Sequence, residues 1–456
     1  MYSMQTASKK VIRGWAMYDW ANSVYNLVIT TTFFPVYYTE MTMASPFNGE
    51  VVFFGRTFVN TALYNYALAF TYLVVAITLP MLSSIADYRG NKKKFMHAFC
   101  TIGAMACSGL YFFTPENFSW GIICMMIAAF GFYSSLVFYN SYLPEIASRE
   151  DRDRISAKGF TAGYIGSVLM QMIGFALVVF WNEIPFLNSA GEAVRWTFLL
   201  VGMWWVGFAQ ITFRRLPKSK PPVDNGPLKN VLSGGFIELR KVFQTLIKMP
   251  VLKRFLWAFF FYNMGVQTVM LAATNFGSKV LNLPSTNLIL TVVAIQLVAI
   301  IGAHSIAKLS TLYGNFQVLI GVVLLWIAIC VSGYYMQTQY HFYIIAIAVG
   351  LVMGGIQSLS RSTYSKLMPE TRDTASFFSF YDVTEKVAIV IGLTSFGFIE
   401  EFTGSMRNSV LSLMVFFTLG LIGLISALSR QKKETRLALS TSNDALGSLS
   451  GTHSKM

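Results

Sequence analysis

Charged residues are scarce in this chain: only 12% of its 456 residues are Asp, Glu, Lys or Arg, whereas 54% are hydrophobic. A soluble globular protein averages about 25% charged residues. The shortage argues against a soluble protein and favours one that places most of its length in a lipid bilayer. The mean hydropathy of +0.53 agrees with this interpretation.

Cysteine and histidine are also rare, with four of each. The cysteines fall in apolar runs without a CxxC pair, and we expect them to be small buried side chains. No histidine lies at a metal-ligand spacing from Cys, Asp or Glu. The sequence contains no GxxxxGK[ST] phosphate loop and no GxSxG nucleophile elbow. We therefore expect no metal, no other cofactor and no ATP-driven step within this chain.

Apolar runs long enough to cross a bilayer recur along almost the whole sequence. A membrane-spanning helix needs about 20 residues, and the alternating ten-residue strands of a membrane barrel do not occur. The sequence predicts an all-α integral membrane protein with twelve transmembrane helices. The predicted spans are 14–38, 61–83, 95–113, 119–142, 159–181, 195–213, 254–276, 287–307, 316–336, 341–360, 377–399 and 408–429.

Basic residues are distributed unevenly between the predicted loops. With both termini placed in the cytoplasm, only four of the 35 Lys and Arg residues fall in outer segments: Arg56, Arg195, Lys279 and Arg407. Lys386 lies within a span, and the other 30 lie at the inner face. Because cytoplasmic loops carry the excess of Lys and Arg, we expect both termini to be cytoplasmic. Topology explains the net charge of +14, so we expect no nucleic-acid partner.

The longest inner segment separates six predicted spans from six. We expect an N-terminal six-helix half over 1–213, a cytoplasmic linker over 214–253, a C-terminal six-helix half over 254–429 and a disordered cytoplasmic tail over 430–456. Apolar residues at helical spacing in the linker predict an amphipathic helix on the inner leaflet. They are Phe236, Leu239, Val242, Phe243, Leu246 and Ile247.

The two predicted halves repeat each other weakly. Tyr88-Arg-Gly-Asn-Lys after the second span is echoed by Leu312-Tyr-Gly-Asn-Phe after the eighth. Tyr142-Leu-Pro-Glu after the fourth span is echoed by Tyr364-Ser-Lys-Leu-Met-Pro-Glu after the tenth. Matching inner loops indicate two parallel repeats about an axis along the membrane normal, an arrangement typical of transporters.

The loop after the second span reads Ser83-Ser-Ile-Ala-Asp-Tyr-Arg-Gly-Asn-Lys-Lys-Lys, with an acid, a glycine three residues later and a basic cluster. It resembles the inner-loop signature of the major facilitator superfamily, although Ser83 stands where the family has Gly. The resemblance implies the major facilitator fold and a gate that contains Asp87, Arg89 and Gly90. Gly90 suits a tight turn, and Asp87 can accept hydrogen bonds from a helix N-terminus. By resemblance that helix is the eleventh span, near 374–378.

Three further stretches carry a narrower resemblance. They are Gly14-Trp-Ala-Met-Tyr-Asp-Trp-Ala-Asn-Ser-Val-Tyr-Asn, Gln357-Ser-Leu-Ser-Arg-Ser and Ser376-Phe-Phe-Ser-Phe-Tyr-Asp. They resemble the branch of the superfamily that includes the fungal autophagy-related vacuolar amino-acid effluxers and their uncharacterised bacterial relatives. The resemblance implies export of amino acids from a compartment.

Polar side chains inside the predicted spans are candidates for substrate contact. A helix rises about 1.5 Å per residue, so the midplane lies about ten residues from either end of a span. The predicted substrate-binding residues are Asn22, Tyr25, Asn26, Gln171, Asn263, Gln267, Gln296 and Lys386. The amides either bind substrate or join helices. Arg361 either binds an anionic group or only marks the inner end of the tenth span, and we assign it to the gate.

The eleventh span contains an acid–base cluster of Asp382, Glu385 and Lys386. An ionised side chain at the bilayer centre costs about 2.5–3.5 kcal/mol, so it persists only when it is paired or faces water. Asp382 and Lys386 are four residues apart on one helix face and are expected to pair. Glu385 then needs another partner or a proton. We expect Asp382, Glu385 and Asp19 to serve proton coupling.

Two interpretations of this cluster stay open. In the first, Lys386 attracts a substrate carboxylate, and Glu385 takes an ammonium group or a proton. The protein is then a secondary carrier of an amino acid or similar zwitterion that works by alternating access. In the second, the cluster is a structural ion pair that locks the eleventh span to a neighbour and contacts no substrate.

Other functions compete with this prediction. The richness in aromatic residues also suits a carrier of amphipathic drugs or peptidoglycan-like fragments. A membrane-embedded enzyme or a transporter-like sensor is disfavoured, because the sequence has no Ser/His or acid/His constellation and no appended soluble domain. We expect a monomer with a small-molecule substrate and with protons or another coupling ion. The short loops favour a bacterial inner membrane.

Overall fold

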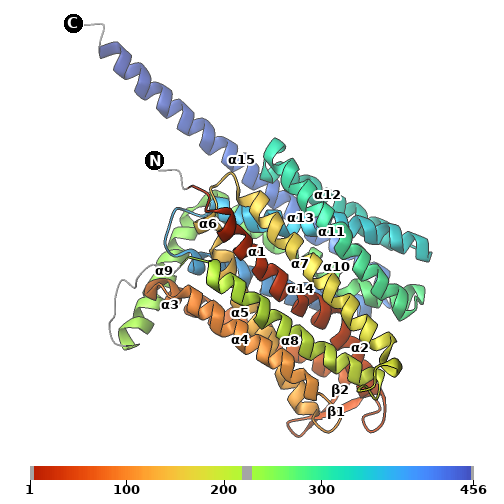
Figure 1. The fold of residues 1–456 in the computed structure, drawn as a ribbon. Coiled ribbons are helices and arrows are strands. Elements are labelled where there is room, and N and C mark those ends of the chain that lie inside the picture. Colours follow the sequence, from red (N-terminus) through yellow and green to blue (C-terminus); the bar gives the residue numbers. More distant parts are fainter. Residues whose placement is uncertain (1–4, 218–227, 453–456) are drawn as a thin grey trace.

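The computed structural model describes residues 5–217 and 228–452. Long helices lie side by side in one bundle, and both ends of the chain lie toward the same end of that bundle (Figure 1). The α-helices are α1 (Lys9–Val24), α2 (Phe34–Met43), α3 (Asn60–Arg89), α4 (Lys92–Gly109), α5 (Phe118–Ser141), α6 (Leu143–Ile146), α7 (Arg152–Val179), α8 (Ala190–Arg215), α9 (Leu228–Lys248), α10 (Pro250–Leu281), α11 (Ser285–Tyr313), α12 (Asn315–Tyr334), α13 (Gln339–Leu367), α14 (Thr374–Thr403) and α15 (Met406–Thr452). A π-helical segment η1 (Tyr25–Phe33), two single turns η2 (Leu110–Phe112) and η3 (Trp181–Glu183), and strands β1 (Glu50–Phe53) and β2 (Arg56–Val59) complete the described elements.

Ten helices in the described part of the chain are long and apolar enough to cross a membrane. They coincide with ten of the twelve predicted spans. The other two predicted spans lie on the continuous helix α1–η1–α2 and on α14, and both carry charged side chains within their apolar runs. Helical structure thus occupies every predicted position, while the crossing of a membrane by these last two helices stays a prediction.

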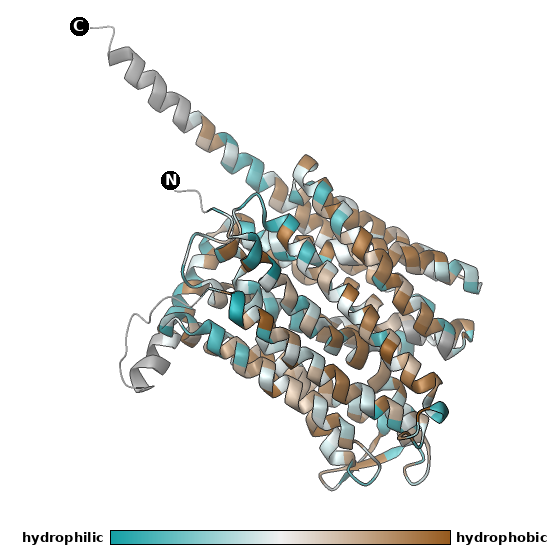
Figure 2. Ribbon diagram, viewed as in Figure 1, coloured by the Kyte–Doolittle hydropathy of each residue, from teal (hydrophilic) through white to brown (hydrophobic). Residues whose placement is uncertain are grey.

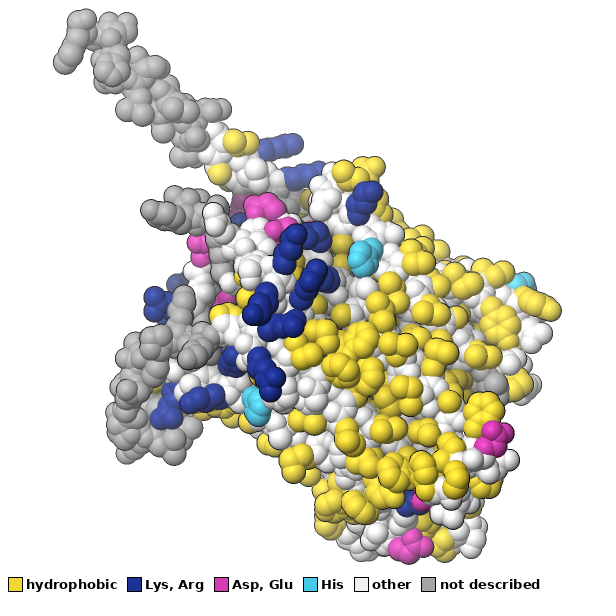
Figure 3. Space-filling model, viewed as in Figure 1, with side chains coloured by type: hydrophobic (Ala, Val, Ile, Leu, Met, Phe, Trp, Pro, Cys, Tyr) yellow, Lys and Arg dark blue, Asp and Glu magenta, His cyan; other side chains and the backbone are white. Residues whose placement is uncertain are grey.

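Apolar and basic side chains are segregated on the molecular surface. Apolar side chains cover the flank of the bundle, and Lys and Arg side chains gather at one end (Figures 2 and 3). We call this the basic end. It holds the first residues of α1, α4 and α7 and the last residues of α3 and α13, while the β1–β2 hairpin lies at the opposite end (Figure 1). An apolar flank between two polar ends is the pattern that a bilayer requires.

The β1–β2 hairpin was not predicted from the sequence. Its strands pair antiparallel, with Phe53 opposite Arg56. The two residues between them, Phe54 and Gly55, have φ angles of 48° and 76°. Two successive positive φ angles form the tight turn whose twist matches paired strands. The strands have four residues each, too few to produce a clear alternating pattern within a segment that reads as a loop.

The first long helix widens into a π-helix at its centre. The N–H of Phe34 bonds to the carbonyl of Ile29, five residues back. Pro35 follows, which has no N–H to donate and crowds the carbonyl four residues earlier. The hydroxyl of Thr31 bonds to the carbonyl of Leu27 at 2.7 Å. π-helical segments frequently occur at functional sites, and this one forms part of the wall of the central cavity.

The predicted amphipathic helix of the linker is present as α9, which lies against α3 and α14 at the basic end (Figure 1). Val242 and Leu246 are buried, and the ring of Phe243 stacks on Phe380 of α14, with 5.8 Å between ring centroids. Phe236 and Ile247 remain exposed. The helix therefore shows apolar side chains both to the protein and outward. Its contact with a lipid leaflet stays a prediction, and linker residues 218–227 lie outside the described part.

The last helix extends beyond its predicted end. α15 continues to Thr452, whereas the sequence analysis predicted a disordered tail from 430 onward. The residues after Arg430 include several good helix formers, and the Nε of Arg430 donates to Glu434 at 2.9 Å, one turn later. Pairs at this spacing stabilise helices. The described residues 430–452 are therefore helical where disorder was expected, disorder of the tail stays a prediction, and 453–456 lie outside the described part.

Candidate functional site

A polar cavity of about 160 Å³ lies at the centre of the bundle, with walls from both predicted halves. A larger cavity of about 580 Å³ adjoins it and shares wall residues such as Leu27, Thr31 and Tyr72. The larger cavity also contacts Tyr64 near the start of α3 and Glu400 near the end of α14. Both positions lie away from the basic end, so the larger cavity lies between the polar cavity and the opposite end.

The first long helix contributes three predicted residues to the polar cavity: Asp19, Asn22 and Asn26. Tyr25, also predicted to bind substrate, does not line it. Its ring packs at 5.5 Å from Trp205 and 5.4 Å from Phe132. Because adjacent residues point about 100° apart on a helix, Tyr25 faces the core of the N-terminal half. Tyr25 thus lies outside the cavity wall in this structure, and its role as a substrate contact stays a prediction.

Six predicted residues of the C-terminal half line the same cavity: Asn263, Gln267, Arg361, Asp382, Glu385 and Lys386. The Nε2 of Gln267 donates to Oε1 of Glu385 at 3.0 Å and lies 3.4 Å from Oδ1 of Asn263. α10 and α14 are therefore joined by amide–carboxylate contacts at the cavity wall. The Nδ2 groups of Asn22 and Asn263 are buried without a partner among the described residues.

Lys386 pairs with Glu385, and not with Asp382 as the sequence analysis expected. Its Nζ lies 3.1 Å from Oε2 of Glu385 and 4.3 Å from the centroid of the Tyr133 ring on α5. The i,i+4 spacing permits a contact with Asp382 but does not require it. The four-carbon side chain instead turns toward the cavity, where the π-face of Tyr133 provides a second favourable contact.

Asp382 is left in an unusual position. It is 2% exposed, and its Oδ2 is buried with no hydrogen-bond partner among the described residues. A buried polar atom without a partner costs about 1–3 kcal/mol, and more when it is charged. Glu385, by contrast, has a side chain that is 22% exposed toward the cavity. The two carboxyl groups of the cluster therefore differ in access.

A buried ion pair forms the wall of the cavity nearest the basic end. The NH1 of Arg361 on α13 lies 3.3 Å from Oδ2 of Asp19 on α1. The hydroxyl of Tyr139 donates to the same carboxylate oxygen at 2.7 Å. Arg361 also donates to Ser156 on α7 and to Asn140 on α5, at 3.0 and 3.3 Å. The pair thus connects the two halves across the bundle.

Aromatic rings surround the Arg361 guanidinium. Its central carbon lies 4.3 Å from the centroid of the Phe160 ring and 4.9 Å from that of Trp15. Cation–π contacts of this kind contribute more when water is excluded. Arg361 and Asp19 were predicted as functional residues but not as a pair, and Tyr139, Asn140 and Ser156 were not among the predicted site residues. Adjacent polar residues at the inner end of a span were the only signal for the first two.

Two predicted glutamines join helices. The Nε2 of Gln296 on α11 donates to Oε1 of Gln171 on α7 at 2.9 Å, and Gln171 donates to Thr32 at 3.1 Å. Gln171 does not line either of the two central cavities, and Gln296 lines only the larger one. The amide of Gln171 is used in a contact between the halves, and its role as a substrate contact stays a prediction.

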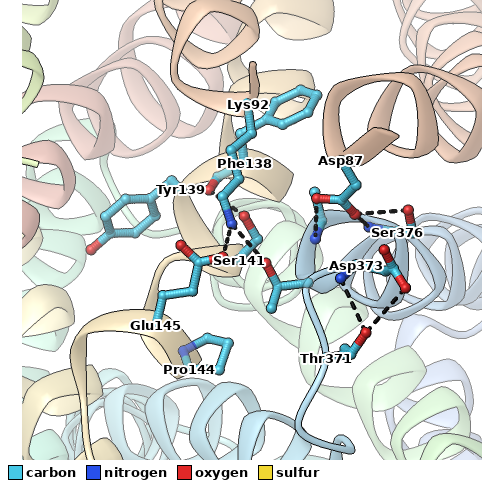
Figure 4. Close-up of polar contacts among 12 residues, drawn as sticks. Asp87, Lys92, Phe138, Tyr139, Ser141, Pro144, Glu145, Thr371, Asp373 and Ser376 are labelled. Atoms are coloured by element: carbon cyan, nitrogen blue, oxygen red, sulfur yellow. Dashed lines mark hydrogen bonds and ion pairs between the residues drawn. The ribbon is translucent and has the colours of Figure 1, made fainter. Parts of the chain in front are cut away.

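The predicted contact of Asp87 is present at the basic end (Figure 4). Its carboxylate accepts hydrogen bonds from the backbone N–H groups of Ala375 and Ser376 at 3.3 and 2.7 Å, and from the Ser376 hydroxyl at 2.8 Å. These residues form the first turn of α14, where a negative charge is favoured. Gly90 ends α3 with a φ of 64°, a conformation that suits glycine.

Lys92 is the basic residue that joins this network, in place of the predicted Arg89. Figure 4 shows its side chain turned toward Glu145, and its Nζ also donates to the Thr374 hydroxyl at 2.7 Å. Lys92 begins α4, and its side chain is buried, whereas Arg89 is the last residue of α3 and only partly buried. The turn at Gly90 directs Lys92, and not Arg89, toward the first turn of α14.

A related network closes the other seam between the halves. Asp153 in the first turn of α7 forms an ion pair with Lys366 near the end of α13. Its two oxygens also accept hydrogen bonds from Ser310 and Asn315, both at 2.9 Å. The second-half copy of the inner loop lacks an acid, and here α7 supplies it. At both seams a carboxylate lies at the first turn of a helix. Asp87 on α3 accepts hydrogen bonds from the first turn of α14, whereas Asp153 itself belongs to the first turn of α7.

Metal ligands do not cluster in the described ranges: no group of three or more His, Cys, Asp or Glu there could hold a metal ion. The four cysteines are free and buried.

The chain matches the protein family described as “Vacuole effluxer Atg22 like” over residues 7–436. It belongs to this family. The “Uncharacterized MFS-type transporter YxiO” of Bacillus subtilis (strain 168) is 30% identical over 90% of this chain and 92% of that protein. “Autophagy-related protein 22-1” of Penicillium rubens is 24% identical over 92% of this chain and 90% of that protein.

Solved structures of other proteins have the same fold. FucP, a major facilitator superfamily transporter in the outward conformation, is similar with a TM-score of 0.67 and 14% identity, over 92% of this chain and 98% of that one. A bacterial homologue of the iron transporter ferroportin, in an outward-facing state, has a TM-score of 0.66 and 12% identity over the same shares. At these identities the likeness shows the fold. This family member is thus a multi-pass membrane transporter of the major facilitator superfamily, not an enzyme.

Proposed function

We propose that this transporter moves a small zwitterion, an amino acid or a similar solute, by alternating access coupled to protons. The observation that carries the proposal is the Glu385–Lys386 pair on the wall of the central cavity, with N–O separation of 3.1 Å. A zwitterion offers the same two charges. Its ammonium group can replace Lys386 at Glu385, and its carboxylate can bind Lys386, so no charge is left unpaired in a medium where that is costly.

The amides around the cavity support a carboxylate ligand. The Nδ2 groups of Asn22 on α1 and Asn263 on α10 are buried there without an acceptor among the described residues. Buried donors normally have partners. A bound carboxylate would give them acceptors from both halves of the protein, and Asn26 and Gln267 complete the proposed substrate-binding set. A ligand held by both halves is what alternating access requires.

We assign the basic end to the cytoplasm, because Lys and Arg mark the inner loops of membrane proteins. Both termini are then cytoplasmic, the halves are 1–213 and 254–429, and a bacterial cell membrane is the expected location. The structure is then closed at the cytoplasmic side by the contacts of Asp87, Arg361 and Asp153. Opening to that side requires these contacts to break. The family description as an effluxer supports export as the physiological direction.

A second candidate substrate is an amphipathic drug or a peptidoglycan-like fragment. The observation that favours it is the larger cavity of about 580 Å³, whose lining includes Pro35, Leu68, Val292 and Leu393. Pockets of roughly 300–1,000 Å³ suit drug-sized ligands. Such a ligand would not need Lys386, so this residue separates the two candidates.

The test is exchange of labelled solute across proteoliposomes that hold the purified full-length protein. Each of the twenty L-amino acids is placed inside at high concentration, and entry of the same labelled amino acid is measured. The proposal predicts exchange of at least one amino acid and its loss in Lys386→Ala. The matched control is Lys308→Ala, an exposed lysine at the basic end, which should exchange like the wild type. Equal exchange by Lys386→Ala would contradict the proposal, and exchange of amphipathic compounds alone would support the second candidate.

A further inference from the structure

We infer that Lys386 is shared between two carboxyl groups, Glu385 and Asp382, so that substrate and proton exclude each other and the protein works as an antiporter. This inference rests on the proposed function, because it requires a substrate ammonium group at Glu385. It goes further by assigning substrate binding to Glu385, the proton to Asp382 and the change of partner to Lys386. It also states that substrate and proton move in opposite directions.

The first observation is the difference in access between the two carboxyl groups. Glu385 has a side chain 22% exposed, and Gln267 and Lys386 hold its two oxygens at the cavity wall. Asp382 is 2% exposed, and its Oδ2 has no partner among the described residues. Both residues line the cavity, but Glu385 is the more accessible to a substrate, whereas Oδ2 of Asp382 is buried and is better placed to take a proton or a neighbouring side chain.

The second observation is the freedom of Lys386 to change partners. Asp382 precedes it by one helical turn, a spacing at which side chains meet. The side chain has four rotatable carbons and three N–H donors, of which the Glu385 contact at 3.1 Å uses one. Lys386 can therefore turn to Asp382 without movement of α14.

The third observation is that the other cation near Asp382 is already engaged. Arg361 donates to Asp19, Ser156 and Asn140. The titratable or charged groups that interact with Asp382 or line the cavity with it are Lys386, Glu385 and Tyr381 on α14, Arg361 and Tyr364 on α13, Tyr262 on α10, Tyr133 on α5, Tyr72 on α3, Tyr164 on α7 and Asp19 on α1. The hydroxyl of Tyr364, which interacts electrostatically with Asp382, donates its hydrogen bond to the Phe377 carbonyl. Lys386 is the cation with donors to spare.

These observations define the state in the structure. An ionised Asp382 with a bare buried oxygen would pay the cost of an unpaired charge. A proton on Oδ2 removes that charge, while Lys386 neutralises Glu385. The cluster of Asp382, Glu385 and Lys386 is then neutral as a whole, with one proton stored on Asp382.

Substrate binding changes the partners in one step. The substrate ammonium group binds Glu385 and displaces Lys386, whose ammonium group turns to Asp382 and keeps contact with the substrate carboxylate. The Nδ2 groups of Asn22 and Asn263, which have no acceptor among the described residues, donate to that carboxylate and stabilise the one negative charge that proton release leaves. The O–H bond of Asp382 breaks, its electron pair stays on the carboxylate, and the proton leaves to water in the cavity. Lys386 keeps all its protons throughout. One substrate is therefore bound for one proton released, which is the rule of an antiporter.

Proton release on binding tests this step directly. Purified full-length protein in weakly buffered detergent solution with a pH-indicator dye is mixed with each of the twenty L-amino acids in turn, and calorimetry records binding. The inference predicts that the bound amino acid releases up to one proton per protein. Asp382→Asn should still bind and release none, whereas Glu385→Gln should lose binding by tenfold or more. Proton uptake on binding, or equal release by wild type and Asp382→Asn, would overturn the inference.

The two levels of failure can be told apart. Binding of no amino acid by the wild type would remove the proposed function, and the antiport rule would fall with it. Binding without proton release would remove the antiport rule and leave the proposed function standing.

Infrared difference spectroscopy of the substrate-free protein provides a second test, whose main result comes from the wild type and does not require Asp382→Asn to fold. It predicts a protonated-carboxyl band in the wild type at neutral pH, which Asp382→Asn lacks and the control Asp151→Asn keeps. Absence of the band in the wild type would overturn the inference even if Asp382→Asn failed to fold.

Discussion

Gly159 leaves the space that the buried ion pair between the halves, Asp19 and Arg361, occupies. A Cβ at this position on α7 would lie 2.3 Å from Oδ2 of Asp19 and 3.0 Å from NH2 of Arg361. Neither atom can retreat easily, because both belong to buried groups with several partners. The Asp19–Arg361 contact therefore requires a residue without a side chain at position 159.

The variant Gly159→Ala should therefore destabilise the protein and lower transport. Forcing an extra methyl group into a packed site costs about 1–3 kcal/mol, so we expect a lower thermal midpoint in detergent and at least tenfold slower exchange. The matched control is Gly207→Ala on α8, where nothing lies within 4 Å of the new Cβ. That change should leave transport intact and, by helix propensity, add up to about 1 kcal/mol of stability. Equal behaviour of the two variants would exclude the steric account.

The residue scale is also where prediction from sequence was least reliable. Depth along a span was predictable, because each residue adds a fixed rise; Asn22, Asn26, Gln267 and Lys386 do line a central cavity. Direction around the helix was not, because it depends on which neighbours pack against which face. Tyr25 therefore faces the core and not the cavity.

At the scale of elements, α9 lies across the contact between α3 and α14 and packs against both helices. Its Lys241 pairs with Glu238 at 3.1 Å and lies 3.9 Å from Asp373, the residue before α14. Burial, with a contribution from the neighbouring Asp373 carboxyl, raises the pKa of Glu238 above its ordinary value. A hydrogen bond to Glu238 raises the pKa of Lys241.

Docking of α9 should therefore weaken as pH rises. A carboxyl whose pKa is raised in the docked state favours docking fully below its ordinary pKa, and this contribution is lost as pH rises through the raised value. Glu238→Gln should remove this part of the pH dependence. The measurement is the distance between nitroxide labels on α9 and α3, followed by electron paramagnetic resonance across pH 4–8. This range runs from just below the ordinary glutamate pKa of about 4.3 to almost four units above it. A distance distribution independent of pH in the wild type would contradict the prediction, and Glu434→Gln on α15 is the control.

The first turn of α14 supports a second prediction for this scale. Asp87→Asn keeps the shape of the side chain but removes the negative charge at the helix N-terminus, where such a charge is worth about 0.3–2 kcal/mol. The closed basic end should become up to roughly thirtyfold less populated relative to the open one. Labelling of a cysteine placed at Ser379, which is buried in this structure, should accelerate accordingly. Unchanged labelling would exclude Asp87 from the gate.

Elements themselves were largely predictable, because hydropathy and length determine where helices form in a bilayer. Two features were not. The π-helical turn at Tyr25–Phe33 depends on the backbone of one helix near Pro35, and the β1–β2 hairpin is too short to show a periodic pattern. The extension of α15 was missed because composition outweighed the helix-forming residues after Arg430.

At the scale of the whole molecule, three sets of contacts between the halves close the basic end, centred on Asp87, Arg361 and Asp153. The sequence repeats predicted two related halves, and the family resemblance predicted the contact of Asp87 with the start of α14. They did not predict that Asp153 on α7 replaces the acid missing opposite Asp87, since only the folded chain brings α7 to the end of α11. The interaction between the halves is thus kept, but its carboxylate comes from a different helix.

The central claim is that the cavity cluster couples amino-acid movement to protons. The measurement that tests it most directly is uptake of labelled amino acids into proteoliposomes with a pH gradient imposed in either direction, for the wild type and Glu385→Gln. The account predicts that an acidic lumen drives accumulation of at least one amino acid in the wild type, and that Glu385→Gln accumulates none. Movement of no amino acid, or equal accumulation by the two proteins, would contradict it.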